Sequence, residues 1–261
     1  MDALEGRLLD LMLVFVLVLS RVGALVATAP IFTATIIPKR VKAILAVSLA
    51  MLMTPLLVDG SWARPPEVIT LGRLIVGEAL VGMLLGLGLS AMMSGVQVTG
   101  QVVGQMSGMA LAETVDPAFQ SNASIFNQVF YFVTMAVFVC IGGHRMTIDA
   151  LLDTFAWAPP GQAQLGAEFG TAMVAMLSLS FELGLRAAAP LLVSLFLATL
   201  VLGLISRTLP QINTIAVGFG LNSMLTVGVM MLTIGSVAWT FQDPLGDTIA
   251  YLRDTAVGAG P

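Results

Sequence analysis

Four ionisable residues interrupt otherwise apolar stretches of the sequence: Arg21, Glu78, Glu182 and Arg186. A charged side chain at membrane depth is costly, so such residues usually serve an ion pathway, a partner contact or an internal ion pair. Glu182 and Arg186 are four positions apart in the favourable order, and they can pair on one face of a helix. Glu78 and Arg21 lack such a neighbour. We expect each to need a partner from another helix or subunit, although the long Arg21 side chain could also reach a membrane interface.

Catalytic chemistry finds no support in the sequence. The chain has one histidine, His144, and one cysteine, Cys140, which are too few ligands for a zinc or haem-type site. The sequence contains no Gly-x-Ser-x-Gly turn to place a nucleophile, no P-loop and no pair of acids within an apolar stretch. We therefore predict a protein that is not an enzyme and that binds no metal and no cofactor.

Polar and small residues recur regularly after position 95. Glutamines repeat every four positions from 97 to 105, and glycines do so from 100 to 108, so that each series forms a stripe along a helix. Glycine stripes allow another helix to approach closely, and amide side chains can bond across such a contact. Ordinary helix packing would explain the stripes as well as a subunit contact. We expect packing of this kind at Gln97, Gly100, Gln101, Gly104 and Gln105.

The next segment, from Met106 to Pro117, combines small and flexible apolar residues with a polar end. Pro117 biases Asp116 away from helical geometry, which favours a loop or turn. A simple connector between helices is one interpretation. The other is a deformable seal, because methionines such as Met106 and Met109 pack adaptively.

The elements that position these residues are membrane helices. The chain has 261 residues, of which 57% are hydrophobic and only 10% are charged. A soluble domain carries roughly a quarter of charged residues, so the composition indicates an integral membrane protein. The formal net charge of −4 argues against a nucleic acid partner.

A bilayer core of about 30 Å requires roughly 20 apolar residues in a helix. Six windows approach this requirement: 11–32, 41–58, 71–95, 125–141, 168–206 and 214–240. The second and fourth are short. The fifth is about twice the needed length, so it either projects beyond the bilayer or breaks near Pro190. The predicted fold class is all-α, a polytopic membrane protein of about six long, partly kinked helices arranged as hairpins.

Three further predictions concern the segments inside and next to these windows. Acidic residues outnumber Arg7 in the first ten positions, which favours a retained first helix over a secretory leader. The basic cluster within Pro38–Lys42 places that loop in the cytoplasm and both termini outside. Met146–Trp157 has helical apolar spacing and two aspartates on another face, which predicts a short amphipathic helix at an interface.

Six motifs occur in order along the chain: Arg21–Ala24 with Ala29–Phe32 and Pro38–Lys42, Glu78 with Gly82, Gly86 and Gly88, Gln97–Pro117, Gly142–His144, Ala188–Leu192, and Gly203–Arg207 with Pro210–Asn213 and Gly218–Leu221. In this order they resemble the FliR family, the R-type subunit of the flagellar and type III secretion export gate. The resemblance implies a P-like part over residues 1–164 and a Q-like C-terminal hairpin over residues 165–261.

The same resemblance implies the function. The expected protein is a core subunit of a flagellar export gate, located in the bacterial inner membrane within the flagellar basal body. Its expected partners are P-type and Q-type subunits, the B-type switch subunit and unfolded protein substrates. The resemblance also implies a plug loop that closes the pore, formed by Met106, Ser107, Gly108, Met109, Ala110, Leu111, Ala112, Glu113, Thr114, Val115, Asp116 and Pro117. The alternative from the residues alone is a small secondary transporter or channel.

Overall fold

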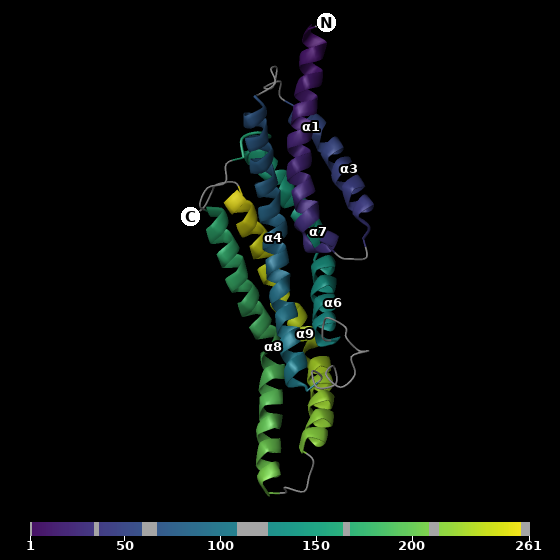
Figure 1. Cartoon of the computed structure of the whole chain (residues 1–261), viewed down its shortest axis with the longest axis vertical. Helices are drawn as coiled ribbons and strands as arrows, with labels where there is room; N and C mark the ends of the chain where they lie inside the picture. Colours follow the sequence, from purple (N-terminus) through teal and green to yellow (C-terminus); the bar gives the residue numbers. More distant parts are fainter. Residues whose placement is uncertain are drawn as a thin grey trace. The chain divides into compact units, whose positions relative to one another are not determined.

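The computed structural model describes residues 2–33, 37–58, 67–108, 125–163, 168–208 and 214–256. All regular secondary structure in these ranges is helical, which confirms the predicted all-α class (Figure 1). The sequence favours this outcome because leucine, alanine and methionine are strong helix formers. The helices are α1 (Asp2–Thr28), α2 (Pro30–Thr33), α3 (Lys39–Leu57), α4 (Val68–Met106), α6 (Ile125–Cys140), α7 (Gly143–Trp157), α8 (Glu168–Thr208) and α9 (Thr214–Ala256).

Four of these helices are long and apolar enough to cross a membrane: Glu5–Thr28 within α1, Lys39–Leu57, Val68–Met106 and Phe169–Thr208 within α8. The fourth expected window is α6, which continues into α7 after a bend of 62°, so this pair provides a fifth span if it is counted as one. The sixth window lies in α9, whose apolar described stretch, Gly220–Thr233, is shorter than a span. The described residues therefore carry four or five candidate spans where hydropathy alone suggested six.

Two helices differ from the simplest expectation in length. α4 continues eleven positions beyond the apolar window, through the glutamines and glycines, to Met106. Polar side chains do not end a helix, because its hydrogen bonds are made by the backbone. α8 has 41 residues and continues through Pro190. The sequence left two outcomes open for this helix: a break near the proline, or a length well beyond a bilayer. The structure shows the second outcome, one continuous helix.

The turn between α6 and α7 depends on a glycine. Gly142 has φ +77°, in the left-handed region that glycine adopts without steric cost. α7 then starts at Gly143 and covers the predicted amphipathic helix. Its buried side includes Leu151 and Phe155, whereas Asp149 is exposed, so the two faces differ as the spacing predicts.

The chain forms two compact units, and both are discontinuous in sequence. The first consists of Met1–Ala91, Gly142–Leu177 and Leu245–Pro261, and the second of Met92–Ile141 and Ser178–Pro244. Each unit contains residues from both sides of the predicted P-like and Q-like boundary. That boundary itself, near 164/165, lies outside the described residues, and the division stays a prediction.

Each unit has its own apolar core. In the first unit α1 packs against α3 (Figure 1), and its fully buried side chains include Leu17, Leu25, Leu84, Leu85 and Leu151. In the second unit the buried side chains come from the end of α4, from α6 and from α8, and include Met92, Val96, Phe138, Leu183 and Leu191. The core of the first unit also contains the buried side chains of Arg21 and Glu78, which are described next.

Candidate functional site

The first unit contains a buried ion pair between α1 and α4. Arg21 Nε donates a hydrogen bond of 2.6 Å to Glu78 Oε2, and both side chains have an exposed fraction of 0%. Arg21 and Glu78 are thus each other's partner in the ion pair, and each comes from another helix, as expected. Two opposite charges that are removed from water together require good geometry and additional hydrogen bonds, because desolvation is costly for both.

The additional hydrogen bonds come from the C-terminal end of α7. Arg21 Nη1 donates to Thr154 Oγ1 at 3.1 Å, and Nη2 donates to the carbonyl oxygen of Ala158 at 3.0 Å. The backbone N–H of Gly161 donates to the second carboxylate oxygen of Glu78, Oε1, at 2.7 Å. The guanidinium carbon also lies 4.0 Å from the centre of the Phe155 ring, a cation–π distance.

This arrangement, which we call the Arg21 cluster, joins three segments: α1, α4 and the stretch from Thr154 to Gly161. Every nitrogen of the guanidinium and both oxygens of the carboxylate have a partner. The two charged side chains are closed off from solvent, and each neutralises the other. The cluster therefore has a structural role as a lock: it holds these three segments together.

Close approach of α1 and α4 brings the two charges together. A Cβ atom at Gly82 would collide with the carbonyl oxygen of Arg21, and one at Gly86 would collide with Oγ1 of Thr28. Further along α4, Ser90 Oγ donates a hydrogen bond of 2.5 Å to the carbonyl oxygen of Thr28. The glycine spacing thus lets the two helix backbones touch, as small residues do in membrane helix pairs.

Glycines create similar contacts in the second unit. A Cβ atom at Gly95 would collide with Ser180 of α8, and one at Gly184 would lie 2.6 Å from the Gly95 carbonyl oxygen and from Thr99 Oγ1. α4 and α8 therefore cross at a pair of glycines. On another side of α4, a Cβ atom at Gly100 would lie 2.7 Å from the Asn127 Cα atom of α6.

The predicted glutamine stripe lies on α4 in the second unit. Gln97 and Gln101 are partly exposed, and Gln105 is exposed, whereas Gly100 and Gly104 are buried. Within this chain the two glycines are buried, and Gly100 closely approaches α6. A contact of the glutamines with another subunit stays a prediction, as does ordinary helix packing.

The structure describes only the start of the predicted plug loop. α4 ends at Met106, the Ser107 hydroxyl donates to the Gly104 carbonyl oxygen at 2.7 Å, and Gly108 has φ +84°. A glycine in the left-handed conformation is a common way to end a helix. The remaining residues, Met109 to Pro117, lie outside the described residues.

The second pair of charges, Glu182 and Arg186, lies on α8. Arg186 Nη2 is 2.5 Å from Glu182 Oε1, and the side chains are 65% and 54% exposed, respectively. The two residues pair on one helix face, four positions apart. In contrast to the buried Arg21 cluster, more than half of each of these two side chains is exposed.

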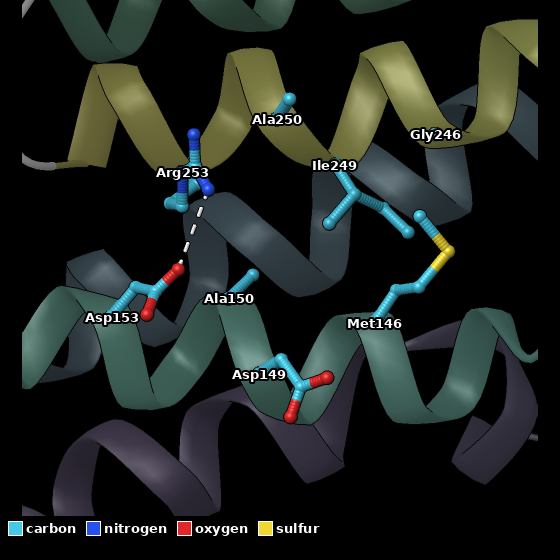
Figure 2. Close-up of a pocket in the computed structure, with 8 residues that line it drawn as sticks. All are labelled: Met146, Asp149, Ala150, Asp153, Gly246, Ile249, Ala250 and Arg253. Atoms are coloured by element: carbon cyan, nitrogen blue, oxygen red, sulfur yellow. Dashed lines mark hydrogen bonds and ion pairs between the residues drawn. The ribbon is translucent and has the colours of Figure 1, made fainter.

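A small groove between α7 and α9 lies in the first unit (Figure 2). It has a volume of about 180 Å³ and a mixed lining that includes Met146, Asp149, Ile249 and Arg253. Arg253 Nη1 bonds Asp153 Oδ2 at 3.4 Å, and the two side chains point toward each other in the view. The hydrogen bond from Arg253 to the neighbouring Asp254 raises the pKa of the Arg253 guanidinium above its ordinary value.

The ion pairs that Arg253 makes with Asp153 and Asp254 are partly exposed, and such pairs contribute little stability because solvent screens them. Among the residues that the structure describes, no group of three or more histidine, cysteine, aspartate or glutamate side chains could hold a metal ion.

Sequence reasoning missed the contribution of α7 to the cluster. Thr154 and Phe155 contact Arg21, although more than 130 positions separate them from it in the sequence. The Gly161 backbone contacts Glu78 across a separation of 83 positions. No spacing rule links residues so far apart. The signal that was available is the polar Thr154, one of two threonines on the buried side of a predicted amphipathic helix.

Comparison with known proteins places the chain in a family. The pattern of the family described as "Bacterial export proteins, family 1" matches residues 12–247. The "Flagellar biosynthetic protein FliR" of Escherichia coli (strain K12) is 33% identical over 216 residues, which are 82% of this chain and 80% of that protein.

Two further relatives have the same description and cover even more of the chain. The FliR protein of Bacillus subtilis (strain 168) is 28% identical over 255 residues, 95% of this chain and 96% of its own length. That of Caulobacter vibrioides is 24% identical over 227 residues, 87% and 90% of the two chains. With a family match from residue 12 to residue 247, this chain belongs to the bacterial export proteins, family 1.

Proposed function

We propose that this chain is a core subunit of the export gate of a flagellar type III secretion system, in the bacterial inner membrane and the flagellar basal body. The observation that carries the proposal is the family match over residues 12–247, together with relatives described as flagellar biosynthetic proteins. Four helices with membrane-spanning length and composition support a membrane location.

The subunit has a structural role in this proposal. It assembles with P-type and Q-type subunits, and with the B-type switch subunit, around a pore for unfolded protein substrates. Two features of the chain support assembly. The α8 span is mostly uncovered, with only 22% of its window buried within the chain, and the glutamines of α4 lie at the surface.

Closure of the pore is assigned to the loop from Met106 to Pro117. The first three residues of this loop, Met106 to Gly108, are described: α4 ends there with a bond from the Ser107 hydroxyl to the Gly104 carbonyl oxygen and a left-handed turn at Gly108. This ending supports a chain that leaves the helix at a defined point. The Arg21 cluster, in the other compact unit, supplies a rigid anchor for α1, α4 and α7.

The test is native mass spectrometry of this chain after coexpression with P-type and Q-type subunits and purification in a mild detergent. The proposal predicts a discrete heteromer of fixed composition that contains this chain. A reproducible monomer or homo-oligomer without P and Q would overturn it and would favour the transporter or channel instead, which ion-flux assays on the purified protein would then examine.

A further inference from the structure

The exposed side of α8 combines two kinds of side chain that do not suit the same solvent. We define the outer face of α8 by Phe181, Glu182, Leu185, Arg186, Val193 and Phe196, all of which are exposed. Phe181 precedes Glu182 in the sequence and Leu185 precedes Arg186, and these two side chains are 62% and 61% exposed. The opposite side of the helix is buried, and Gly184 there packs against α4.

Neither lipid nor water is a suitable neighbour for this face. Hydrocarbon would leave the Glu182–Arg186 pair without hydration, which is costly even for paired charges. Water would leave a contiguous stripe of large apolar side chains exposed, and such stripes mark interaction sites. A protein surface resolves both problems, because an interface core is apolar and enriched in phenylalanine and arginine.

The ion pair also indicates the chemistry of the partner. The two side chains are joined through Arg186 Nη2 and Glu182 Oε1, whereas a guanidinium has five N–H donors and a carboxylate has two oxygens. Most of this hydrogen-bonding capacity is unused within the pair. An occupant that covers the face must therefore offer at least one acceptor opposite Arg186.

We infer that the outer face of α8 is a subunit interface, occupied by an apolar helix of a neighbouring export-gate subunit that presents an amide or carboxylate side chain to Arg186. This inference rests on the proposed function and specifies one of its contacts. The Glu182–Arg186 pair sets the position of the partner helix along α8, because the acceptor must lie opposite the guanidinium.

A charge swap tests the inference. Glu182→Arg with Arg186→Glu retains an ion pair within α8 but reverses the charges that face the partner. The matched control is Arg145→Asp with Asp149→Arg, since that pair on α7 has the same spacing and is also exposed. After coexpression with P-type and Q-type subunits, we expect the swap on α8 to reduce recovery of the complex at least tenfold, and the swap on α7 to leave it within twofold.

A second measurement does not depend on the folding of the swapped chain. A photoreactive phenylalanine analogue at Leu185, between the two charges, should crosslink to a P-type or Q-type subunit. Crosslinks to lipid alone, or full recovery of the complex with the swapped pair, would overturn the inference and leave the proposed function intact. Failure of the unmodified chain to form any complex with P and Q would overturn both.

Discussion

Arg21 and Glu78 are 57 positions apart in the sequence, yet Arg21 Nε lies 2.6 Å from Glu78 Oε2 with both side chains completely buried. The pair is satisfied on all sides by groups from α7 and the turn that follows it. The pair lies completely buried in the first compact unit, and it gives the sharpest stability prediction for this protein.

Glu78→Ala removes the carboxylate and leaves the Arg21 guanidinium buried without a counter-charge. Breaking a buried pair from one side typically costs about 3–5 kcal/mol, so we expect a large loss in the stability of the purified protein in detergent. Thermal unfolding followed by circular dichroism measures this loss. The control is Arg145→Ala in the exposed pair on α7, which should change the midpoint little. Equal midpoints for the two variants would contradict the role of the Arg21 cluster as a lock.

The glycine contact between α4 and α8 predicts that two Gly→Ala substitutions change the stability of the chain in opposite directions. Gly95→Ala places a methyl group against Ser180, and overpacking of this kind costs about 1–3 kcal/mol. Gly203→Ala adds the same group on α8, where nothing lies within 4 Å of the new atom, and alanine favours a helix by up to about 1 kcal/mol. Denaturant titration of both variants checks the prediction, which a stabilising Gly95→Ala would contradict.

Deletion of residues 110–116 tests the plug. If the loop seals the pore, the assembled complex should leak small ions after the deletion, because a seal of apolar side chains is lost while α4 keeps its described end at Met106. Conductance of the purified complex in planar bilayers measures the leak. An intact complex with no more leakage than the unmodified one would exclude this role for the loop.

Replacement of Gln97, Gln101 and Gln105 by leucine tests the amide stripe. The three side chains lie at least partly exposed on α4, so the substitution should leave the fold of this chain largely unchanged and weaken its copurification with the P-type subunit. Gel filtration and circular dichroism of the free chain provide the control. Copurification at the unmodified level would mean that the amides do not contact a neighbouring subunit.

Local patterns predicted the local structure correctly. The helical class followed from composition, the α7 helix followed from its apolar spacing, and Glu182 and Arg186 pair as their spacing of four indicated. The C-terminal end of α4 was harder to predict from the sequence. A hydropathy window ends where glutamines begin, whereas the helix continues to Met106 because its backbone hydrogen bonds do not depend on the polarity of the side chains.

The sequence by itself determined that this protein is helical and apolar, since composition and short-range spacing act within one or two helical turns. Its family followed from the resemblance of ordered motifs, and the match over residues 12–247 confirms it. Only the tertiary structure decided which partner Arg21 has, which glycines of α4 touch α8, and which charges remain uncovered on α8. These outcomes depend on contacts between residues that are far apart in the chain. Such contacts form when helices pack, and no local rule specifies which faces meet.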